Sequence, residues 1–496
     1  MKLKQNILLP LVLVSAMTQA NENITQQSNQ WYKAAQQTLQ ENIAIKLNTK
    51  RAKNVIILVA DGNGVGTNYA TRIWQGQKNG LLGEEYVLPQ EKFPHIALVK
   101  TYNTNAQTPD SAGTGTAMHS GVKTKAGMLG VDDSVVRGDC SAVAAGSVDS
   151  IAEILAKKGK AIGIISTARL THATPASVYA HSADRNFEDN TKLPEGCVGQ
   201  KDIAVQLIEK MASGEVDFAM GGGRRHFLPK DVKDGENKSG RRTDGKNLIE
   251  KAQGFGAQYA WDQASFDKLD TSGDKPVLAL FESSHMKYEH DRTNEPSLAQ
   301  MVEKGIKTLS NNKQGYFLHV EAGRVDHASH DGNAHRAMTD GAAFMAAVKK
   351  AVELTNSEDT LIIVTADHEH AIAFNGYCGR GTPITGLCMG IDTKGTKHTN
   401  TPEKADDGKP YTVLGYLNGS GSVLKEDQNW TGTRPALTQA DAIDPDYIQQ
   451  ALIPKSSETH SGEDVAVYAS GPWAHLFNGT VEQNYIFHVM LHAATN

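Results

Sequence analysis

The sequence predicts an α/β fold with a mostly parallel central sheet that is flanked by helices on both faces. Short runs of β-branched and other apolar residues are continuous rather than alternating, as in strands that are buried on both faces. Stretches with helical periodicity separate these runs, which is typical of strand–helix–strand units. Acids and histidines directly follow several of the runs, and in parallel sheets functional sites lie beyond the carboxyl ends of the strands.

Each element of this fold follows from its local sequence. Strands are expected at the β-branched runs Val55–Ala60, Ile96–Val99, Ala161–Ser166, Val216–Met220, Val277–Phe281, Tyr316–Val320, Thr360–Thr365 and Val465–Ala469. Helices are expected between them, at Ser147–Lys158, Ile203–Ala212, Ser297–Leu309 and Ala334–Leu354. Gly221–Gly223 is interpreted as a turn after a strand, because it lacks the spacing of a phosphate-binding glycine loop.

The rest of the chain suggests an N-terminal arm and an inserted lobe. Trp31–Leu47 contains helix formers with apolar residues on one side, so residues 21–48 are expected to form an arm with an amphipathic helix. That helix packs either on its own domain or on a partner subunit. Residues 375–458 are rich in Gly, Thr, Asn, Asp and Pro. We therefore expect one catalytic domain, residues 49–496, with a surface lobe of short strands and loops inserted at 375–458 near the site.

The N-terminus has the pattern of a secretory signal. Lys2 and Lys4 precede the short apolar run Ile7–Val14, and Thr18–Ala20 resembles a cleavage site, so residues 1–20 are expected to be removed on export. The alternative is a buried N-terminal helix. The apolar run is too short to span a bilayer, and no other segment is a candidate. The mature protein is therefore expected to be periplasmic or secreted.

Composition limits the possible partners and the redox state. The chain has 496 residues with a net charge of −6 and 39% hydrophobic residues, enough for a large core. No basic cluster suggests nucleic-acid binding. Four cysteines are an even count, which in an exported protein permits disulfides. Proximity in sequence favours Cys140 with Cys197 and Cys378 with Cys388, although spacing alone leaves three connectivities open.

A candidate nucleophile lies in Gln107–Met118, QTPDSAGTGTAM. The proline makes Thr108 extended, and the small and polar residues that follow favour a turn into a helix with Ser111 in its first turn. There the hydroxyl lies beside free backbone N–H groups, which stabilise an alkoxide and bind anions such as phosphate. Taken alone, such a segment is more often an ordinary capped helix start, and the acids and histidines elsewhere in the chain favour the nucleophile.

Acids and histidines at the predicted strand ends are candidate metal ligands. Asp61 follows a strand, and as a buried acid it needs a cation unless it caps a helix. Asp326 and His330 are spaced i, i+4 and share a helix face, where they can hold one metal ion. The other candidates are His172 and Thr174 after one strand, Glu321 at the end of another, Asp367 and His368 after a third, and His460 before the last. His370 is expected to orient a ligand, or to be a further ligand itself.

These ligands are oxygen and imidazole donors without thiolates. They suit zinc together with magnesium or manganese, and they exclude iron–sulfur and copper(I) chemistry. Two close metal ions beside a serine suit displacement at phosphorus. Arg185 is a candidate clamp for the phosphate oxygens, although a loop arginine is more often a solvated charge.

With these motifs in order, the chain resembles the alkaline phosphatases. The resemblance extends from about Val55 to Pro472 and rests on VADGNG, TPDSAGTGTA, THATPASVYAHSADRN, GGGRR, DGKNL, EAGRVDHASH, TADHEH and ETHSGEDVAV. It implies an alkaline-phosphatase-like α/β fold and broad phosphate monoester hydrolysis through a phosphoserine, with an alkaline optimum. It also implies two zinc ions, one magnesium ion and a homodimer, and it makes the inserted lobe similar to the crown of the animal enzymes.

The resemblance assigns a role to each candidate residue. Ser111 is implied to be the nucleophile, and Arg185, His327 and Asp110 are implied to bind substrate. One zinc ion is implied to be held by Asp326, His330 and His460, and the other by Asp61, Asp367 and His368 beside Ser111. The implied magnesium ligands are Asp61, Thr174 and Glu321, with His172 acting through water.

Two positions resemble the animal branch of the family. His172 and His327 stand where the best-known enteric bacterial enzymes carry aspartate and lysine, so the chain resembles a bacterial member with the animal-type pair of histidines. Weaker magnesium binding and easier phosphate release are expected from this pair. Cys140 and Cys197 stand where the animal branch has a disulfide. The animal calcium site is only partly matched, through Glu282, and calcium binding is therefore in doubt.

Three other functions compete with this interpretation. A phosphodiesterase or phosphonatase of the same superfamily shares the two-metal arrangement, but DSAGTGTA, Arg185 and the third metal set favour monoesters. A sulfatase is disfavoured because the sequence has no Cys- or Ser-x-Pro-x-Arg motif. An exported metal- or phosphate-binding protein without turnover does not need the serine.

Overall fold

The computed structural model describes residues 25–395, 398–422 and 432–496, which form two compact units that divide after Lys46. The predicted signal peptide, residues 1–20, lies outside the described residues. In the first unit, η1 (Thr25–Ser28) precedes α1 (Gln30–Ile43), whose first turn is capped by Asn29. This helix ends four residues before the predicted Leu47. Among the described helices, none combines the length and the apolar character that crossing a membrane requires.

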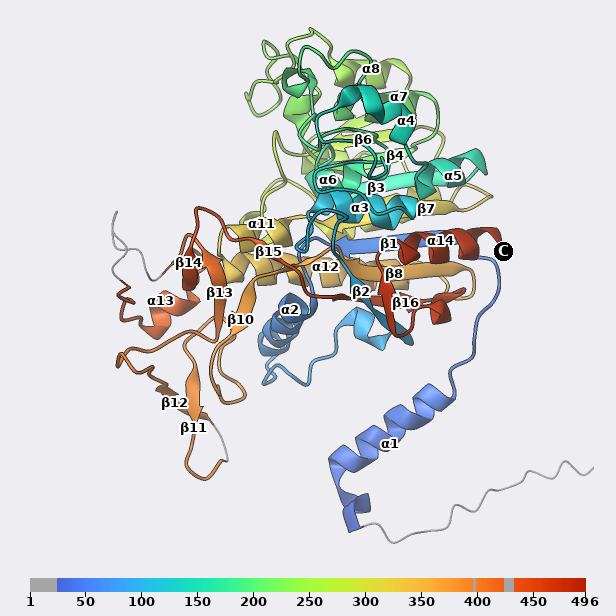
Figure 1. Ribbon diagram of the computed structural model, residues 1–496. Coiled ribbons are helices and arrows are strands. Elements are labelled where there is room, and N and C mark those ends of the chain that lie inside the picture. Colours follow the sequence, from blue (N-terminus) through green and yellow to red (C-terminus); the bar gives the residue numbers. More distant parts are fainter. Residues whose placement is uncertain (1–24, 396–397, 423–431) are drawn as a thin grey trace, which may run out of the picture. The chain divides into compact units, whose positions relative to one another are not determined.

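The second unit, Leu47–Asn496, is built on one central sheet of ten strands (Figure 1). Its order is β17-β2-β16-β8-β1-β7-β3-β4-β6-β5, and only β16 runs antiparallel to its neighbours. The strands are β1 (Asn54–Ala60), β2 (His95–Lys100), β3 (Ala161–Arg169), β4 (Phe218–Gly222), β5 (Gln258–Ala260), β6 (Val277–Leu280), β7 (Tyr316–Ala322), β8 (Thr360–Ala366), β16 (Val465–Ser470) and β17 (Thr480–Glu482). The predicted mostly parallel sheet is therefore confirmed.

Side chains of β1 alternate between two separate hydrophobic clusters. Val55 and Ile57 pack in a cluster with α3 (Ser111–Ser120), α5 (Ile151–Lys157), α6 (Ala173–Ala176), α7 (Ile203–Ala212), α8 (Leu248–Gly254) and α14 (Tyr485–Thr495). Ile56 and Leu58 pack in another with α9 (Gln263–Asp267), α10 (Leu298–Leu309) and α12 (Ala334–Glu353). Because successive strand residues face opposite sides, both faces of the sheet are covered by helices, as predicted.

Three sequence-based expectations differ from the structure. The helix predicted from Ser147 begins only at Ile151, because Ser150 and Glu153 form a capping box there. The strand predicted at Ile96–Val99 is not buried on both faces, because β2 lies near the sheet edge and leaves Ile96 half exposed. The short strands β5 and β17 are not among the predicted strands, because three-residue edge strands carry little periodic signal.

The remaining elements lie around this sheet. They are α2 (Val65–Lys78), α4 (Val143–Gly146) and α11 (Arg324–His330), with the 3-10 turns η2 (Pro89–Lys92), η3 (Cys140–Ala142), η4 (Asn190–Lys192), η5 (Arg224–His226), η6 (Glu289–Asp291) and η7 (Ala474–Leu476). The turn predicted at Gly221–Gly223 is shorter than expected, because Gly221 and Gly222 pair with β6 and β3 as the end of β4. Only Gly223, with a left-handed φ of 99°, links the strand to η5.

The stretch predicted as a lobe contains small sheets. A three-stranded sheet joins β10 (Ile372–Phe374), β13 (Leu414–Gly419) and β14 (Ala451–Pro454), and β11 (Met389–Ile391) pairs with β12 (His398–Pro402). The short helix α13 (Gln439–Ile443) lies among them. On either side of this stretch, β9 (Glu369–His370) pairs with β15 (His460–Ser461). That pairing brings His370 beside His460, and Figure 1 shows the lobe on the side of the sheet where α11 lies.

Strand register determines where the candidate ligands meet. Ala60, the last residue of β1, lies opposite Ala322 of β7 and Ala366 of β8. Asp61 and Asp367, which follow directly, therefore emerge side by side. Glu321 of β7 lies opposite Ser166 of β3, whose continuation leads to α6. Four adjacent parallel strands thus deliver their polar ends to one edge of the sheet.

Candidate active site

Ser111 is the first residue of α3. Asp110 caps the helix, its carboxylate accepting a hydrogen bond of 3.1 Å from the Gly113 N–H. The Ser111 hydroxyl is buried and lies 3.2 Å from His368 Nε2 and 3.4 Å from Asp61 Oδ1. The predicted nucleophile is therefore at a helix N-terminus, where free N–H groups favour negative charge.

Asp61, Asp367 and His368 form a fully buried group beside Ser111. His368 Nε2 lies 3.3 Å from both Asp61 Oδ1 and Asp367 Oδ2. The Gly62 N–H donates a 3.0 Å hydrogen bond to Asp367 and fixes that carboxylate. Three potential ligand atoms thus converge on the serine hydroxyl.

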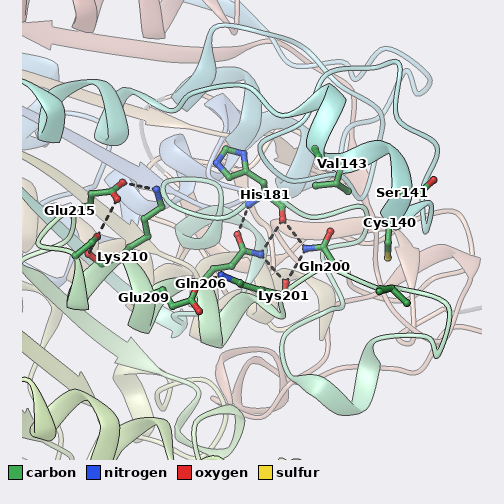
Figure 2. A pocket seen from close by; sticks show the side chains of 14 residues that line it. Cys140, Ser141, Val143, His181, Gln200, Lys201, Gln206, Glu209, Lys210 and Glu215 are labelled. Carbon is green, nitrogen blue, oxygen red and sulfur yellow. Dashed lines mark hydrogen bonds and ion pairs between the residues drawn. The ribbon is translucent and has the colours of Figure 1, made fainter.

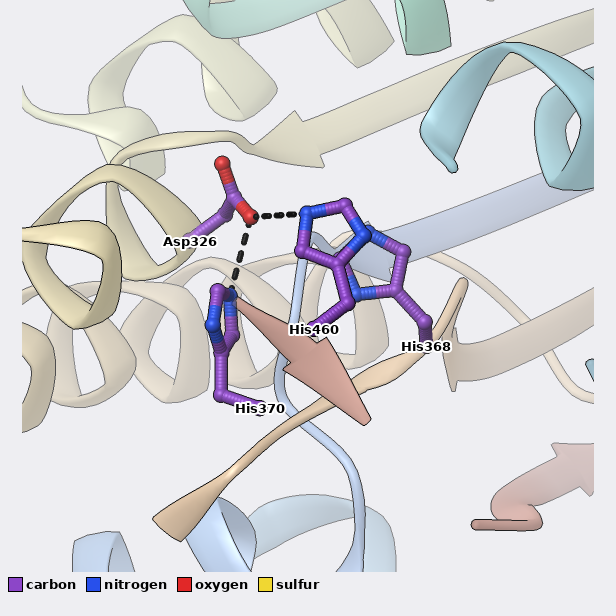
Figure 3. A group of neighbouring side chains, drawn as sticks. All are labelled: Asp326, His368, His370 and His460. Carbon is purple, nitrogen blue, oxygen red and sulfur yellow. Dashed lines mark hydrogen bonds and ion pairs between the residues drawn. The ribbon is translucent and has the colours of Figure 1, made fainter. Parts of the chain in front are cut away.

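Asp326, His330 and His460 form a second group. His460 Nε2 lies 3.2 Å from Asp326 Oδ1 and 3.1 Å from His330 Nε2, and Figure 3 shows Asp326 between His460 and His370. The two groups adjoin, because the rings of His368 and His460 stack with centroids 3.5 Å apart. Two metal ions held by these groups would lie close together.

Backbone carbonyls fix the tautomers of two of these histidines. His330 Nδ1 donates to the Glu458 carbonyl at 2.6 Å, and His460 Nδ1 donates to the Pro109 carbonyl at 2.8 Å. Each ring therefore keeps its Nε2 lone pair for the group it faces. This is the arrangement in which histidines bind metals in proteins.

His370 lies between two carboxylates. Its Nε2 is 2.9 Å from Asp326 Oδ1, and its Nδ1 is 2.6 Å from Glu458 Oε2. Although burial opposes the charged ring, Asp326 and Glu458 raise the pKa of His370 well above its usual value. An imidazolium that donates from both nitrogens orients Asp326 and has no lone pair for a metal. Of the two roles considered from the sequence, the geometry favours the orienting one.

A third group lies on the other side of Asp61. Thr174 Oγ1 is 3.4 Å from Asp61 Oδ2, and Asp61, His172 and Glu321 bring their ligand atoms together. The Ser166 hydroxyl donates to Glu321 Oε2, whereas Glu321 Oε1 is buried and has no hydrogen-bond partner among the described residues. This carboxylate oxygen is available to a cation.

The phosphate clamp predicted at Arg185 lies beside Ser111's helix. Arg185 donates to Asp110 Oδ2 at 3.1 Å, and its other terminal nitrogen lies 3.1 Å from His172 Nε2. The rings of His172 and His327 have centroids 5.3 Å apart. Arg185 is therefore held beside Asp110, the residue before Ser111, and His172 links it to His327.

Burial of so many acids shifts their protonation. Burial and the Asp61 charge raise the pKa of Glu321 well above its usual value and that of Asp367 to about 7. Burial opposes a charged His368, but the Asp367 and Asp61 carboxylates raise its pKa to about 9. The carboxylates cannot all ionise together without compensating positive charge.

The residues present fit metal ions in three places. Hard carboxylates, a hydroxyl and neutral imidazoles are donors for zinc and magnesium. The orphaned buried oxygen of Glu321 and the facing Nε2 lone pairs of His330 and His460 are both explained by a cation between the groups.

The surroundings of Glu282 bear on the partly matched calcium site. The Glu282 carboxylate lies 3.1 Å from Lys238 Nζ and 3.6 Å from Lys287 Nζ. Two ammonium groups supply positive charge there, but burial and the Glu282 charge raise the pKa of Glu295 to about 7, and its buried Oε2 has no partner among the described residues.

Three residues around the site are missing from the sequence-based prediction. Glu458 lies two residues before His460 in ETHSG, and its carboxylate is bonded to His370. Ser166 holds Glu321, and His285 packs on His327 with ring centroids 3.9 Å apart. Only Glu458 has a signal in the sequence, namely an acid beside a candidate ligand. The other two act through strand pairing and loop packing, which the sequence does not display.

A cavity of about 570 Å³ lies elsewhere, against the disulfide between Cys140 and Cys197 (Figure 2). Its two lysines are paired, Lys201 with Glu209 at 2.6 Å and Lys210 with Glu153 at 2.8 Å. No predicted catalytic or metal-binding residue lines it. The second disulfide joins Cys378 to Cys388, so both pairs favoured by proximity are present.

Comparison with known proteins identifies consistent relatives. The family model described as alkaline phosphatase matches residues 52–496. The tissue-nonspecific alkaline phosphatases of Gallus gallus and Homo sapiens are each 42% identical over 94% of this chain, covering 89% and 88% of their own lengths. An alkaline phosphatase of Gadus morhua is 41% identical over 94% of this chain and 96% of its own.

Solved structures share the fold. An alkaline phosphatase of Thermus thermophilus superposes with a TM-score of 0.63 at 21% identity, over 90% of this chain and 92% of that one. A cold-active alkaline phosphatase from a psychrophilic Shewanella gives a TM-score of 0.62 at 22% identity, over 89% of this chain and 100% of that one.

Proposed function

This chain belongs to the alkaline phosphatase family, and we propose that it hydrolyses phosphate monoesters by nucleophilic attack from Ser111. It is a phosphoric monoester hydrolase and metal-dependent, as its family is. The observation that carries the proposed mechanism is the position of Ser111 Oγ at the first turn of α3, within 3.4 Å of both His368 and Asp61.

Each metal group takes a defined set of residues in this proposal. Asp326, His330 and His460 hold one zinc ion, and Asp61, Asp367 and His368 hold the other. Asp61, Thr174 and Glu321 hold magnesium, with His172 acting through water. When bound, these ions lower the pKa of hydroxyl groups and neutralise negative charge on phosphate and on the leaving oxygen.

The chain's own groups carry the displacement. The Ser111 oxygen, having lost its proton, forms a bond to phosphorus while the bond from phosphorus to the ester oxygen breaks, and the leaving alcohol takes up a proton. Water then attacks the phosphoserine, so the bond from Ser111 to phosphorus breaks and the hydroxyl regains a proton. Arg185 binds the non-bridging oxygens, helped by the N–H groups at the start of α3. Asp110 holds Arg185 in place through its 3.1 Å bond.

His172 and His327 distinguish this site within the proposal. His172 Nδ1 and His327 Nδ1 are buried without a hydrogen-bond partner among the described residues. A neutral imidazole lacks the negative charge with which an aspartate attracts magnesium, and it lacks the positive charge with which a lysine attracts phosphate. Replacement by His172→Asp and His327→Lys is expected to tighten magnesium and phosphate respectively, measured by titration calorimetry. Unchanged affinities would contradict these two roles.

Further features complete the proposal. Residues 1–20 direct export to the periplasm or the medium, residues 21–48 form an arm, and residues 49–496 form the catalytic domain with a lobe at 375–458. The disulfides Cys140–Cys197 and Cys378–Cys388 suit an oxidising compartment, which supports export. The enzyme acts as a homodimer with broad specificity and an alkaline optimum.

The decisive experiment compares a chromogenic phosphate monoester with its diester and its sulfate at pH 8–10. Turnover of the monoester should collapse on chelation and fall by about 10³-fold or more in Ser111→Ala. The matched control is Ser120→Ala, the same change in the same helix, where the hydroxyl bonds to backbone groups of Thr116 and Val122 and to no candidate site residue. Preference for the diester would favour the phosphodiesterase alternative. Absence of turnover by metal-loaded protein would favour a binding protein.

A further inference from the structure

Arg324 is an arginine at the active site without a carboxylate partner. The neighbouring arginines are paired: Arg169 with Glu188 at 2.7 Å and Arg185 with Asp110 at 3.1 Å. Among the ion pairs of residues 25–395, 398–422 and 432–496, none involves Arg324, and its Nε is buried without a hydrogen-bond partner. The Arg324 guanidinium therefore has no carboxylate in direct contact, and Asp340 and Asp291 act on its charge only at longer range.

Helix geometry places Arg324 on the face of α11 that carries site residues. Arg324, His327 and His330 are the three half-buried residues of this helix, whereas the four residues between them are buried. Side chains three residues apart lie on one face of a helix. Arg324 therefore lies one turn before His327, on the helix face that also carries His330.

Tyr288 holds the guanidinium in place without using its donors. The central carbon of Arg324 lies 3.6 Å from the centroid of the Tyr288 ring. Tyr288 is itself fixed, because its hydroxyl donates to Asp331 Oδ2 at 2.6 Å. Stacking fixes the plane of a guanidinium and leaves its edge free to bind an oxyanion in a bidentate manner.

Two guanidinium groups approach the same pair of histidine rings. His285 and His327 pack with ring centroids 3.9 Å apart. The Arg169 guanidinium contacts the His285 ring, and Arg324 lies one turn before His327 on α11. Guanidinium groups gathered in this way favour a negative ligand.

We propose that Arg324 binds a second phosphate group on the leaving group of the substrate, and so makes this enzyme prefer substrates with two phosphates. The inference rests on the proposed function, because it assumes that the first phosphate is at Ser111. Arg324 touches the substrate outside the reacting atoms and therefore determines specificity rather than the chemical step. An anion with a second phosphate gains the bidentate contact that a neutral alcohol cannot make.

Matched substrates test the proposal. The pair is 3-hydroxypropyl phosphate and propane-1,3-diol bisphosphate, which share one carbon chain and differ in the distal phosphate. In the wild type, kcat/KM should favour the bisphosphate beyond the statistical factor for its two phosphates. Arg324→Gln should lower this preference about tenfold, with the monophosphate changed by about twofold or less. Arg324→Lys should retain part of the preference, since lysine keeps the positive charge but cannot bind a phosphate through two parallel N–H groups as a guanidinium does.

Arg336→Gln is the matched control. Arg336 approaches the same Tyr288 ring at 5.8 Å, but its guanidinium is paired with Asp291 at 2.8 Å. Its substitution should leave the preference unchanged. Ethanediol and butanediol bisphosphates vary the spacer in both directions. The wild type should prefer one spacer length, because a fixed guanidinium binds a distal phosphate at one distance, and Arg324→Gln should show no such preference.

A measurement on the wild type avoids the risk of a misfolded variant. Raising ionic strength should weaken the preference for the bisphosphate more than it slows the monophosphate, because the distal contact is electrostatic and the Arg324 side chain is only partly buried. A bisphosphate preference no greater than the statistical factor for its two phosphates, or an equal loss for both substrates in Arg324→Gln, would overturn the proposal. Retained turnover in Ser111→Ala would instead contradict the proposed function, which separates the two failures.

Discussion

The Nε2 atoms of His330 and His460 face each other at 3.1 Å, while each ring donates from Nδ1 to a backbone carbonyl. Both nitrogens that meet are therefore acceptors, and two lone pairs at that distance repel each other. Asp326 Oδ1 lies within 3.3 Å of each and adds negative charge. The folded chain thus holds an arrangement that a bound cation stabilises.

Metal removal should lower stability as well as activity. A ligand that binds only the folded state stabilises it by about 4 kcal/mol at a thousand times its dissociation constant. Thermal denaturation with and without chelator should show a lower midpoint for the chelated protein, and added zinc should restore it. His330→Ala should reduce the zinc-dependent gain, whereas His488→Ala, at an exposed position on α14, should retain it. A wild-type midpoint that is the same with chelator and with added zinc, or the same zinc-dependent gain in His330→Ala and His488→Ala, would contradict metal binding by this group.

Glu458→Gln should weaken metal binding without removing a ligand. The Glu458 carboxylate holds His370, which in turn holds Asp326, and an amide cannot stabilise the charged imidazole. Loss of such an orienting partner typically costs 10- to 100-fold in metal affinity or activity. Competition with a chromogenic zinc chelator measures the affinity directly. Glu463→Gln, at an exposed position in the same segment, is the control and should bind zinc as the wild type does.

Asp340→Asn should change how stability depends on pH. Asp340 of α12 is 4% exposed, and its carboxyl accepts a 3.0 Å hydrogen bond from the Glu289 N–H. Burial raises its pKa to about 8, with Glu289 and Asp291 adding to the effect and Arg324 opposing it. In the unfolded chain an aspartate has a pKa of about 4. Between these values the folded state holds more protons, so stability falls as pH rises from about 4 to about 8.

An asparagine keeps the acceptor and removes the ionisation. The variant should therefore be more stable than the wild type by about 1–3 kcal/mol at pH 9 and gain little at pH 4. Urea unfolding at both pH values measures the difference, and Asp267→Asn, at an exposed position, is the control. A variant whose stability follows the same pH profile as the wild type would refute a buried neutral Asp340.

Local sequence predicts the fold because each kind of element has its own apolar pattern. The buried strands of the sheet centre, such as β1 and β8, are continuous apolar runs, whereas in helices such as α7 the apolar residues recur every three to four residues. The predicted start of α5 at Ser147 is too early, because the capping box at Ser150 decides where the helix begins. Short edge strands are determined by their neighbours rather than by their own residues.

The site can be anticipated where residues follow strand ends, begin a helix as Ser111 does, or share a helix face as Asp326 and His330 do. Asp61, Asp367 and Glu321 are predictable in this way, since parallel register aligns their strands. His285 is not, because it reaches His327 from a loop whose path depends on its contact with β4. Arg324 is visible in the sequence, but its lack of a carboxylate partner emerges only from packing.

The contact between β4 and that loop supports the last prediction. A Cβ atom on Gly222 would lie 2.2 Å from the Ser284 carbonyl oxygen and 3.1 Å from the Cα atom of His285. Because the obstacle is backbone, Gly222→Ala must displace the loop, at a cost of about 2 kcal/mol or more. Urea unfolding should show a lower midpoint, and monoester turnover should fall because His285 moves away from His327.

A second glycine separates this steric effect from a general effect of alanine. Gly254 ends α8, is exposed and has no atom within 4 Å of a Cβ built on it. Gly254→Ala should therefore be neutral or stabilising by up to about 1 kcal/mol, because alanine restricts the unfolded chain more than glycine does. If Gly222→Ala were tolerated as well as Gly254→Ala, a glycine at the last residue of β4 would not be required for the close approach of the loop. The placement of His285 would then depend on Arg169, whose guanidinium contacts the His285 ring, rather than on the bare backbone of the strand.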